Sequence, residues 1–222
     1  MQDLRRHEVF EMEVLDRLRS GRFLELLVFG GGTMLRLCHE LPRYSVDLDF
    51  WFARKRQPAV FYKNLLNFLE GHYVVTDAQD KHFTLLYEFK SESSPRKLKI
   101  EIRKDAVKRG TELQIAYSPY AQKQVMLRAF SLEETARRKV AAALDRSEMR
   151  DFFDLEFLLR KGVKFKCLTT EAGKLLKKIG SFKKTDYSGI LGSLLEKDTR
   201  TYYSEQGFIQ LQRYLEKLPD SQ

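Results

Sequence analysis

The segment that most constrains the fold is a run of glycines, Gly30-Gly31-Gly32, followed by Thr33. The apolar residues 23–29 (FLELLVF) before it predict a short buried strand, and TMLRLCHEL after it predicts a helix that Pro42 ends. Glycines let a phosphate group approach the backbone, and the first turn of a helix offers free N–H groups to an anion. These residues alone also fit a tight strand-to-helix turn that binds nothing.

A pair of carboxylates follows this turn. Residues 43–52 (RYSVDLDFWF) alternate in polarity, which predicts a strand with Asp47 and Asp49 on one face and Leu48 and Phe50 in the core. Two carboxylates at this spacing can hold one or two Mg²⁺ ions, which stabilise the attacking and leaving oxygens of a phosphoryl transfer. A D-x-D sequence by itself is common on solvated strands. Its position after the glycine turn is what favours a site for nucleotide chemistry.

The rest of the chain falls into two regions of different character. The first, residues 1–125, is predicted to be an α/β module with helices over about 3–20 and 58–70 and further strands within 72–78, 81–90 and 96–104. The second, residues 126–222, is predicted to be α-helical. Its expected helices cover about 131–144, 147–161, 168–179, 186–196 and 204–217, and the first begins with the capping-box pattern SLEE.

Positive charge is concentrated in one part of the second region. The whole chain has a formal net charge of +9, and residues 160–184 contain nine Lys or Arg and a single acid, Glu171. Such a cluster predicts a nucleic-acid-binding surface, although a solvated helix face remains an alternative. The candidate contacts are Arg160, Lys161, Lys164, Lys174, Lys177 and Lys178.

The composition argues against several other classes of protein. Cys38 and Cys167 are the two cysteines and form no C-x-x-C pair, so neither a disulfide framework nor a zinc site is expected. The sequence contains no apolar run long enough to span a membrane, and its charged N-terminus lacks the apolar core of a signal peptide. We therefore expect a protein of the reducing cytoplasm that makes no contact with a membrane.

The segment GGTMLRL…LPRYSVDLDF resembles the opening motif of the polymerase-β-like nucleotidyltransferases. It is most similar to the AbiEii and MenT branch, in which a G-G-T-x-L helix start precedes R-x-S-x-D-L-D-F. The resemblance implies that Asp47 and Asp49 bind metal. It also implies that Gly31, Gly32 and Thr33 hold phosphate and that Arg43 and Ser45 flank the nucleotide.

A second segment, LEETARRKVAAALDRSEMRDFFDL, resembles the second motif of the same family. The resemblance implies that Lys139 contacts the nucleotide phosphates and that Asp151 orients the site, so that both join Asp47 and Asp49 as catalytic residues. The residues alone leave blander alternatives open, an exposed helix lysine and a surface ion-pair ladder. Asp154 is a candidate to brace Arg146 or Arg150.

A third carboxylate is expected in this superfamily on a later strand, and residues 98–102 (LKIEI) offer Glu101. Glu101 either completes the metal shell or neutralises the neighbouring lysines on a wet face. If it is a metal ligand, its side chain has to lie on the same side of the sheet as Asp47 and Asp49.

The resemblance implies an α+β fold, with a polymerase-β-like nucleotidyltransferase core built on a small mixed sheet and an α-helical C-terminal domain. The implied activity is Mg²⁺-dependent transfer of a nucleoside monophosphate from an NTP to the 3′ acceptor end of tRNA. Such a reaction blocks translation, as suits the toxin of a toxin–antitoxin system, and the implied partner is a cognate antitoxin. The alternatives are a nucleotidyltransferase acting on a small molecule or a protein, and an inactive RNA- or nucleotide-binding module.

Overall fold

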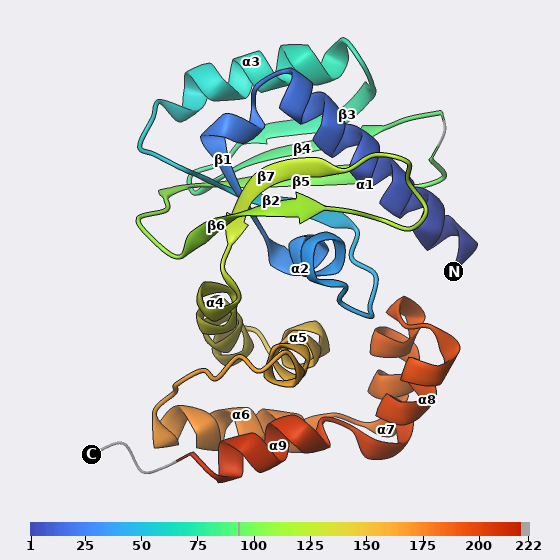
Figure 1. Cartoon of the computed structure of the whole chain (residues 1–222), viewed down its shortest axis with the longest axis vertical. Coiled ribbons are helices and arrows are strands. Elements are labelled where there is room, and N and C mark those ends of the chain that lie inside the picture. The colour runs from blue at the N-terminus through green and yellow to red at the C-terminus, as the bar shows by residue number, and fades with distance from the viewer. Residues whose placement is uncertain (93, 219–222) are drawn as a thin grey trace. The chain divides into compact units, whose positions relative to one another are not determined.

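The computed structural model describes residues 1–92 and 94–218, which form two compact units (Figure 1). The first unit contains residues 1–40 and 44–131, and the second contains residues 41–43 together with the chain from Leu132 onward. Strand β7 (Val125–Phe130) therefore lies in the first unit, beyond the boundary expected at residue 125. The short segment Leu41–Arg43 belongs to the second unit although it lies between two elements of the first.

The first unit is built on one mixed sheet. Its strand order is β3-β4-β5-β2-β1-β7-β6, with β2 parallel to β5, β1 parallel to β7 and the other neighbours antiparallel. The strands are β1 (Leu27–Gly30), β2 (Asp47–Phe52), β3 (Val74–Asp80), β4 (Thr84–Lys90), β5 (Leu98–Ala106), β6 (Thr111–Ala116) and β7. The sheet and the helices together confirm the expected α+β class.

The strand β2 lies in the middle of this sheet, and its two faces differ as the alternation predicts. Leu48 is 0% exposed and Phe50 1% exposed, whereas Asp47, Asp49 and Trp51 are only partly buried. Helices α1 (Gln2–Ser20) and α3 (Pro58–Glu70) cover the apolar face (Figure 1). The opposite face of β2 therefore presents the carboxylates.

Aromatic rings of α1 and α3 pack edge-to-face against rings of the strands that these helices cover. Phe10 of α1 meets Phe89 edge-on at 5.9 Å between ring centroids, and Phe61 of α3 meets Phe52 at 5.0 Å. Edge-to-face packing of this kind contributes to stability beyond the area that the rings bury.

Two expected elements near the glycine run are corrected by the structure. The first half of the apolar run 23–29 is a 3₁₀ turn over Leu24–Leu26, and the strand covers only Leu27–Gly30. An apolar run does not by itself distinguish a strand from a buried turn, which explains the error. Helix α2 (Gly31–His39) ends before Pro42, because Glu40 adopts a left-handed conformation with φ 64°.

The edge strand β6 and its neighbour β7 were not expected. Only Ala116 of β6 is fully buried, and Leu113 and Ile115 are 63% and 49% exposed, so β6 lacks a clear alternation of buried and exposed residues. Its strand conformation comes from pairing with β7, which the local sequence does not encode. The strand conformation of β6 therefore depends on tertiary pairing and not on its own sequence pattern.

The second unit is helical, as expected. Its helices are α4 (Leu132–Asp145), α5 (Met149–Arg160), α6 (Thr169–Ser181), α7 (Lys184–Asp186), α8 (Lys197–Gln206) and α9 (Ile209–Glu216). Helix α4 begins directly after Ser131, where the capping pattern places it. Aromatic side chains form much of the core, for example Phe153 against Tyr203 and Phe152 against Phe208.

The last third of the chain differs from the expected helices in two places. Residues 186–196 are not one helix, because a π-helical turn (Tyr187–Leu191) and a 3₁₀ turn (Gly192–Leu194) follow α7. The expected helix 204–217 is divided at Gly207, whose φ of 58° ends α8. Glycines within these segments permit backbone conformations that end a regular helix. In the part of the chain that the structure describes, no helix is long and apolar enough to cross a membrane.

The first prediction concerns the core beneath β2. Replacing Phe50 by Ala removes a ring that is 1% exposed and stacks on Phe29 at 5.1 Å, so we expect the free energy of unfolding to fall by about 3–5 kcal/mol. Trp51 is the single tryptophan of the chain and lies in the first unit, so its fluorescence during urea denaturation reports on this unit. Phe83→Ala, at a side chain that is 68% exposed, is the control and should change the free energy of unfolding by less than about 0.5 kcal/mol. An equal effect of the two substitutions would contradict this account of the core.

Candidate active site

The carboxylates of the first unit are gathered by strand register. Asp49 of β2 lies directly opposite Glu101 of β5, and Asp47 lies opposite Lys99, in a parallel pairing without a slip over these residues. Residues opposite each other on paired strands project to the same face, and so do residues i and i+2. Asp47, Asp49 and Glu101 therefore share the face of the sheet that lies opposite α1 and α3.

A lysine lies among these carboxylates. The Lys99 Nζ is 3.3 Å from Asp47 Oδ2 and 3.0 Å from Glu101 Oε1. Partial burial alone would lower the pKa of Lys99, but Glu101 and Asp47 outweigh this effect and raise the pKa. Glu101 thus pairs with a neighbouring lysine. Its side chain also lies on the face that a metal ligand would require.

The glycine turn approaches Asp49 more closely than any other residue type would permit. Gly31 has φ 76°, and a Cβ built on it would lie 2.2 Å from Asp49 Oδ2. The N-terminal turn of α2, which begins at Gly31, is thus held directly beside a site carboxylate. The first N–H groups of a helix have no partner within the helix and favour an anion such as a phosphate.

Thr33 and Ser45 have different surroundings from those of the glycines. Thr33 is 0% exposed, and its hydroxyl donates a hydrogen bond of 2.6 Å to the backbone carbonyl of Asp47. This bond ties α2 to the first residue of β2, so the Thr33 side chain positions Asp47. Ser45 is half-buried in the segment before β2.

Buried polar residues of α1 also fix the start of β2, and sequence reasoning gave them no role. His7 Nε2 donates a hydrogen bond of 3.0 Å to the backbone carbonyl of Val46. The same Nε2 lies 3.6 Å from Glu11 Oε1. Glu8 accepts hydrogen bonds from Arg36 at 2.8 Å and from Ser118 at 2.7 Å. A sequence signal existed, because His7, Glu8 and Glu11 share one helix face with buried apolar residues.

Glu11 is a buried carboxyl near the start of β2. Burial raises the pKa of Glu11 well above its ordinary value, and the nearby charges of Glu8 and Asp47 raise it further. The Arg36 guanidinium acts in the opposite direction, but its effect is the smallest of these.

The second unit contains a buried cluster of charges. Arg43 forms two hydrogen bonds of 2.7 Å with the carboxylate of Asp154, and Lys139 Nζ lies 2.6 Å from Asp154 Oδ2 and 2.8 Å from Asp151 Oδ1. Arg146 binds Asp151 at 2.9 and 3.2 Å. Asp151 and Asp154 are 0% exposed and Lys139 is 8% exposed, so the surface-ladder and exposed-lysine alternatives are wrong. Three cations face two carboxylates in this cluster.

The partners of Asp154 differ from those expected. Asp154 pairs with Arg43 and Lys139, while Arg146 binds Asp151, and Arg150 binds Glu148 instead. Burial alone would raise the pKa of Asp154, but the charges of Arg43 and Lys139 hold it below its ordinary value. Burial alone would lower the pKa of Lys139, but Asp154 and Asp151 hold it above its ordinary value. Asp154 and Lys139 are therefore both charged near neutral pH.

A family model of known proteins matches most of the chain, including both groups of residues described above. Residues 13–217 match the family described as nucleotidyl transferase AbiEii toxin, type IV toxin–antitoxin system. The chain belongs to the AbiEii nucleotidyltransferase family. The AbiEii match covers both the glycine–aspartate segment and the buried cluster, and it identifies the protein as a nucleotidyltransferase. No curated protein matches the sequence.

Solved structures with the same fold include two bacterial proteins. JHP933 from Helicobacter pylori is 20% identical, with a TM-score of 0.53 over 94% of each chain. MenT4, a nucleotidyltransferase toxin from Mycobacterium tuberculosis, is 16% identical, with a TM-score of 0.55 over 96% of this chain and 86% of its own. At these identities the likeness supports the shared fold, while the AbiEii family match carries the activity.

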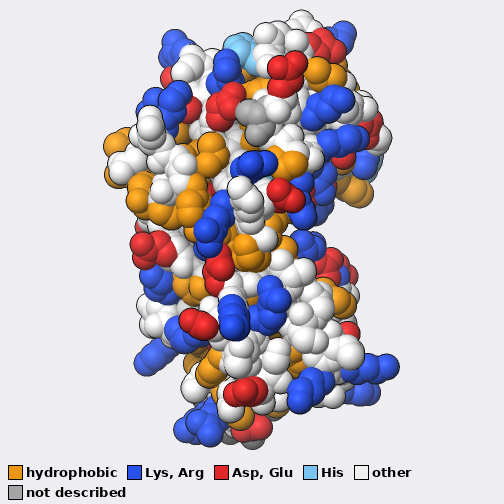
Figure 2. Space-filling model, turned by 90° about the vertical axis from the view of Figure 1, so that its right-hand side faces the viewer, with side chains coloured by type: hydrophobic (Ala, Val, Ile, Leu, Met, Phe, Trp, Pro, Cys, Tyr) orange, Lys and Arg blue, Asp and Glu red, His pale blue; other side chains and the backbone are white. Residues whose placement is uncertain are grey.

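The basic stretch of this AbiEii protein contains both internal contacts and exposed cations. Lys178 donates to the carbonyl oxygens of Ala143 at 2.9 Å and Leu144 at 2.6 Å, so it caps the end of α4. Arg160 contacts the hydroxyl and the ring face of Tyr203. All the cations of the stretch except Lys178 are exposed, among them Lys161, Lys164, Lys174 and Lys177. Basic and acidic side chains are interspersed on the face shown in Figure 2, so this face presents no continuous basic surface for a polyanion.

The glycine turn yields a second prediction. Gly31→Ala forces a Cβ into the Asp49 carboxylate and imposes a left-handed conformation on alanine, which costs about 1–2 kcal/mol before any clash. We expect lower stability of the first unit in urea denaturation and weaker binding of a fluorescent NTP analogue. In Gly173→Ala, where no atom lies within 4 Å of the added methyl, we expect a gain of roughly 0.5–1 kcal/mol and unchanged NTP affinity. Unimpaired NTP binding by Gly31→Ala would argue against the role of this turn.

The buried cluster yields a third prediction. Asp154→Asn leaves Arg43 and Lys139 without the carboxylate they share, so we expect the second unit to lose about 3–5 kcal/mol at neutral pH. Because the folded pKa of Asp154 is depressed, its stabilisation is present above the unfolded value of about 3.9 and is lost as pH falls through the folded pKa. The difference between wild type and variant should therefore shrink below about pH 5.

Urea denaturation followed by far-UV circular dichroism at several pH values measures this difference. Asp145→Asn, at an exposed position of α4, is the matched control and should be nearly neutral. A difference that stays constant down to pH 3 would show that the charge of Asp154 is not what stabilises the cluster.

Proposed function

We propose that this AbiEii protein transfers a nucleoside monophosphate from an NTP to the 3′ end of an RNA, with Mg²⁺ as cofactor and tRNA as the acceptor. The observation that carries the proposal is the register of β2 and β5, which brings Asp47, Asp49 and Glu101 to one face beside the glycine turn. Modification of the tRNA acceptor end blocks translation, which is consistent with the toxin family. A cognate antitoxin would be the protein partner.

The residues of this face fit a magnesium ion. Mg²⁺ is usually bound by one or two carboxylates together with the phosphates of the substrate, and Asp47 and Asp49 supply such a pair. The Lys99 ammonium contacts both Asp47 and Glu101, which shows that a cation is accommodated among these oxygens. Over residues 1–92 and 94–218, no three acidic, histidine or cysteine side chains converge as a complete metal cage. We therefore expect the substrate phosphates to complete the shell.

The chain itself supplies positioning and charge. Bound Mg²⁺ would neutralise the triphosphate and favour deprotonation of the attacking hydroxyl. The backbone N–H groups of Gly31 and Gly32 at the start of α2 would hold the phosphates that leave as pyrophosphate. Thr33 and His7 keep the first residues of β2 in place through backbone hydrogen bonds. Such preorganisation is the main contribution that a protein makes to phosphoryl transfer.

Lys139 is the residue of the second unit that we expect to contact phosphate. An ammonium has three N–H donors, and Asp151 and Asp154 accept from two of them, which leaves one for a ligand. The two carboxylates also keep Lys139 charged and fix its direction. Asp151 acts in this proposal as a positioning residue, held in turn by Arg146.

The acceptor is proposed to be RNA because the second unit offers a basic cavity with aromatic walls. This cavity of about 800 Å³ is lined by the cations Arg160, Lys164, Arg213 and Lys217 and by the rings of Tyr202 and Tyr214. Cations that track a phosphate backbone and rings on which bases stack are the usual means of binding single-stranded RNA. The basic stretch found in the sequence contributes Arg160 and Lys164 to it.

Incubation of the purified protein with total tRNA, Mg²⁺ and each radiolabelled NTP in turn tests this proposal. We expect one or more NTPs to label tRNA, and Asp49→Asn to reduce the rate by about 100-fold or more, because a lost metal ligand raises the barrier by several kcal/mol. Asp77→Asn on the edge strand β3 is the matched control and should retain the wild-type rate.

The possible outcomes separate the activity from the acceptor. Labelled NTP that binds but never enters tRNA would overturn the RNA acceptor and favour a small molecule or a protein in its place. Equal rates for Asp49→Asn and wild type would overturn the assignment of the site to the β2 carboxylates.

A further inference from the structure

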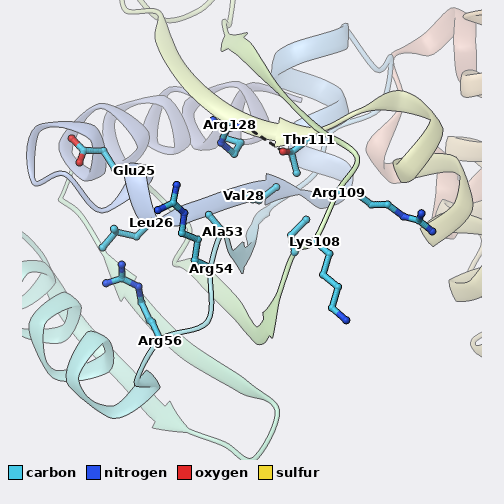
Figure 3. Close-up of a pocket in the computed structure, with 11 residues that line it drawn as sticks. Glu25, Leu26, Val28, Ala53, Arg54, Arg56, Lys108, Arg109, Thr111 and Arg128 are labelled. Atoms are coloured by element: carbon cyan, nitrogen blue, oxygen red, sulfur yellow. Dashed lines mark hydrogen bonds between the residues drawn. The ribbon is translucent and has the colours of Figure 1, made fainter.

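A second cavity lies in the first unit, at the opposite end of β1 and β2 from the glycine turn (Figure 3). Its volume is about 520 Å³, and the segments that follow β2 and precede β6 form part of its wall. Its charged lining consists of the cations Arg54, Arg56, Lys108, Arg109 and Arg128 and a single acid, Glu25. Neither the charge cluster found in the sequence nor the proposed catalytic residues include any of these side chains.

Within the described residues, the positive charge of this cavity is not compensated by ion pairs. Glu25 is already bound by Arg22, which donates hydrogen bonds of 3.0 and 3.2 Å to its two carboxylate oxygens. Arg128 reaches only the hydroxyl of Thr111, at 3.4 Å. In the described parts of the chain, no carboxylate pairs with any of the five cations of the lining. Exposed, like-charged side chains gathered around one hollow attract a polyanion.

Strand register places this cavity on the same face of the sheet as the carboxylates. In the antiparallel pair β1–β2, Gly30 lies opposite Asp49 and Val28 opposite Trp51. Val28, which lies opposite Trp51, lines the cavity, and so does Ala53, the residue directly after β2. Along β2, at about 3.3 Å per residue, Val28 is level with a point roughly 7 Å from Asp49, whereas Ala53 and the cations that follow it lie roughly 13 Å or more away.

Two packed rings separate the cavity from the carboxylates. Trp51 meets Phe130 of β7 edge-on, with their ring centroids 4.9 Å apart. A Cβ added to Gly30 would lie 2.6 Å from Trp51 and 2.8 Å from Phe130, so these rings pack against the backbone of the glycine turn. The carboxylates, this pair of rings and the basic cavity thus follow one another along a single face.

We propose that this cavity binds the sugar–phosphate backbone of the acceptor RNA, about four nucleotides from the end that reacts. The distance of roughly 13 Å from Asp49 to the cations that follow Ala53 corresponds to about four stacked nucleotides at ~3.4 Å each. Four of the five cations are arginines, whose planar guanidinium matches two phosphate oxygens at once. The inference rests on the proposed function, because it names a binding site for that acceptor.

An acidic protein segment is the other polyanion to consider, and the cavity fits it less well. Protein interfaces usually depend on exposed apolar or aromatic anchors. Over the part of the chain that the structure describes, the cavity lining contains no aromatic ring, and its apolar members are buried or half-buried: Leu26, Val28, Ala53 and Val107. An acceptor strand must also continue along the protein surface away from the carboxylates at which its end reacts. A basic cavity on the same face of the sheet meets that requirement. A docking site for a protein would not need to lie on that face.

The test compares two triple variants that remove the same charge. Arg54→Gln/Arg56→Gln/Lys108→Gln removes three cations from the cavity, and Lys63→Gln/Lys81→Gln/Lys90→Gln removes three exposed cations from elsewhere in the first unit. Affinity for a fluorescent tRNA is measured over a series of salt concentrations. We expect the cavity variant to lose about two units of the slope of log affinity against log salt, since each single-strand phosphate contact contributes ~0.7. The control variant should keep the wild-type slope.

A second measurement distinguishes a local contact from a general loss of charge. The KM for RNA is determined in the transfer reaction with full-length tRNA and with a trinucleotide that ends in the same 3′ sequence. We expect the cavity variant to raise the KM for tRNA about tenfold and to leave the KM for the trinucleotide unchanged, because so short an acceptor does not reach the cavity. The affinity for NTP in the absence of RNA is the check that the carboxylate site remains intact.

Each outcome has a distinct meaning. If the wild type labels tRNA but both triple variants share its slope and KM, the cavity inference is wrong and the proposed function stands. If the cavity variant loses binding of an antitoxin while its tRNA slope is unchanged, the cavity is a protein-docking site and the inference is again wrong. If the wild type neither binds nor labels RNA, the proposed function fails and the cavity inference fails with it.

Discussion

The arrangement of the first unit depends on the register of β2 with its two neighbours. A slip of one residue would turn Asp47 and Asp49 into the core and Leu48 and Phe50 out of it, so the burial of these apolar residues fixes the carboxylates on the open face. The same register places Glu101 opposite Asp49. The apolar core beneath α1 and α3 therefore supplies the energy that orients a polar site on the other side of the sheet.

Both units use ion pairs to hold functional side chains, but in different environments. Lys99 is partly exposed between Asp47 and Glu101, where water and a ligand can compete for the carboxylates. In the second unit Lys139 and Asp154 are almost completely buried, and removing either one would leave the other buried charge with one partner fewer. The first arrangement leaves its carboxylates able to exchange partners, whereas the second keeps one lysine charged and fixed in direction.

The AbiEii family supplies the class of reaction, and the structure shows how this chain is suited to it. A turn that only glycine permits lies against a carboxylate, and the face that carries this carboxylate continues into a cavity rich in arginine. Positive charge along the sheet suits an acceptor that is itself a polyanion, and negative charge at the proposed nucleotide site suits the proposed metal ion. The proposed RNA acceptor joins these two features in one substrate.

The sequence by itself determined the helices α1, α3, α4 and α5, the two faces of β2 and the family, because apolar periodicity and the two motifs are local properties. It did not predict β6 and β7, whose strand conformation comes from their pairing with each other and with β1. It also gave Asp154 the wrong partners and missed both His7 and the basic cavity. These contacts join residues far apart in the chain, and only tertiary folding decides which of many charged side chains meet in space.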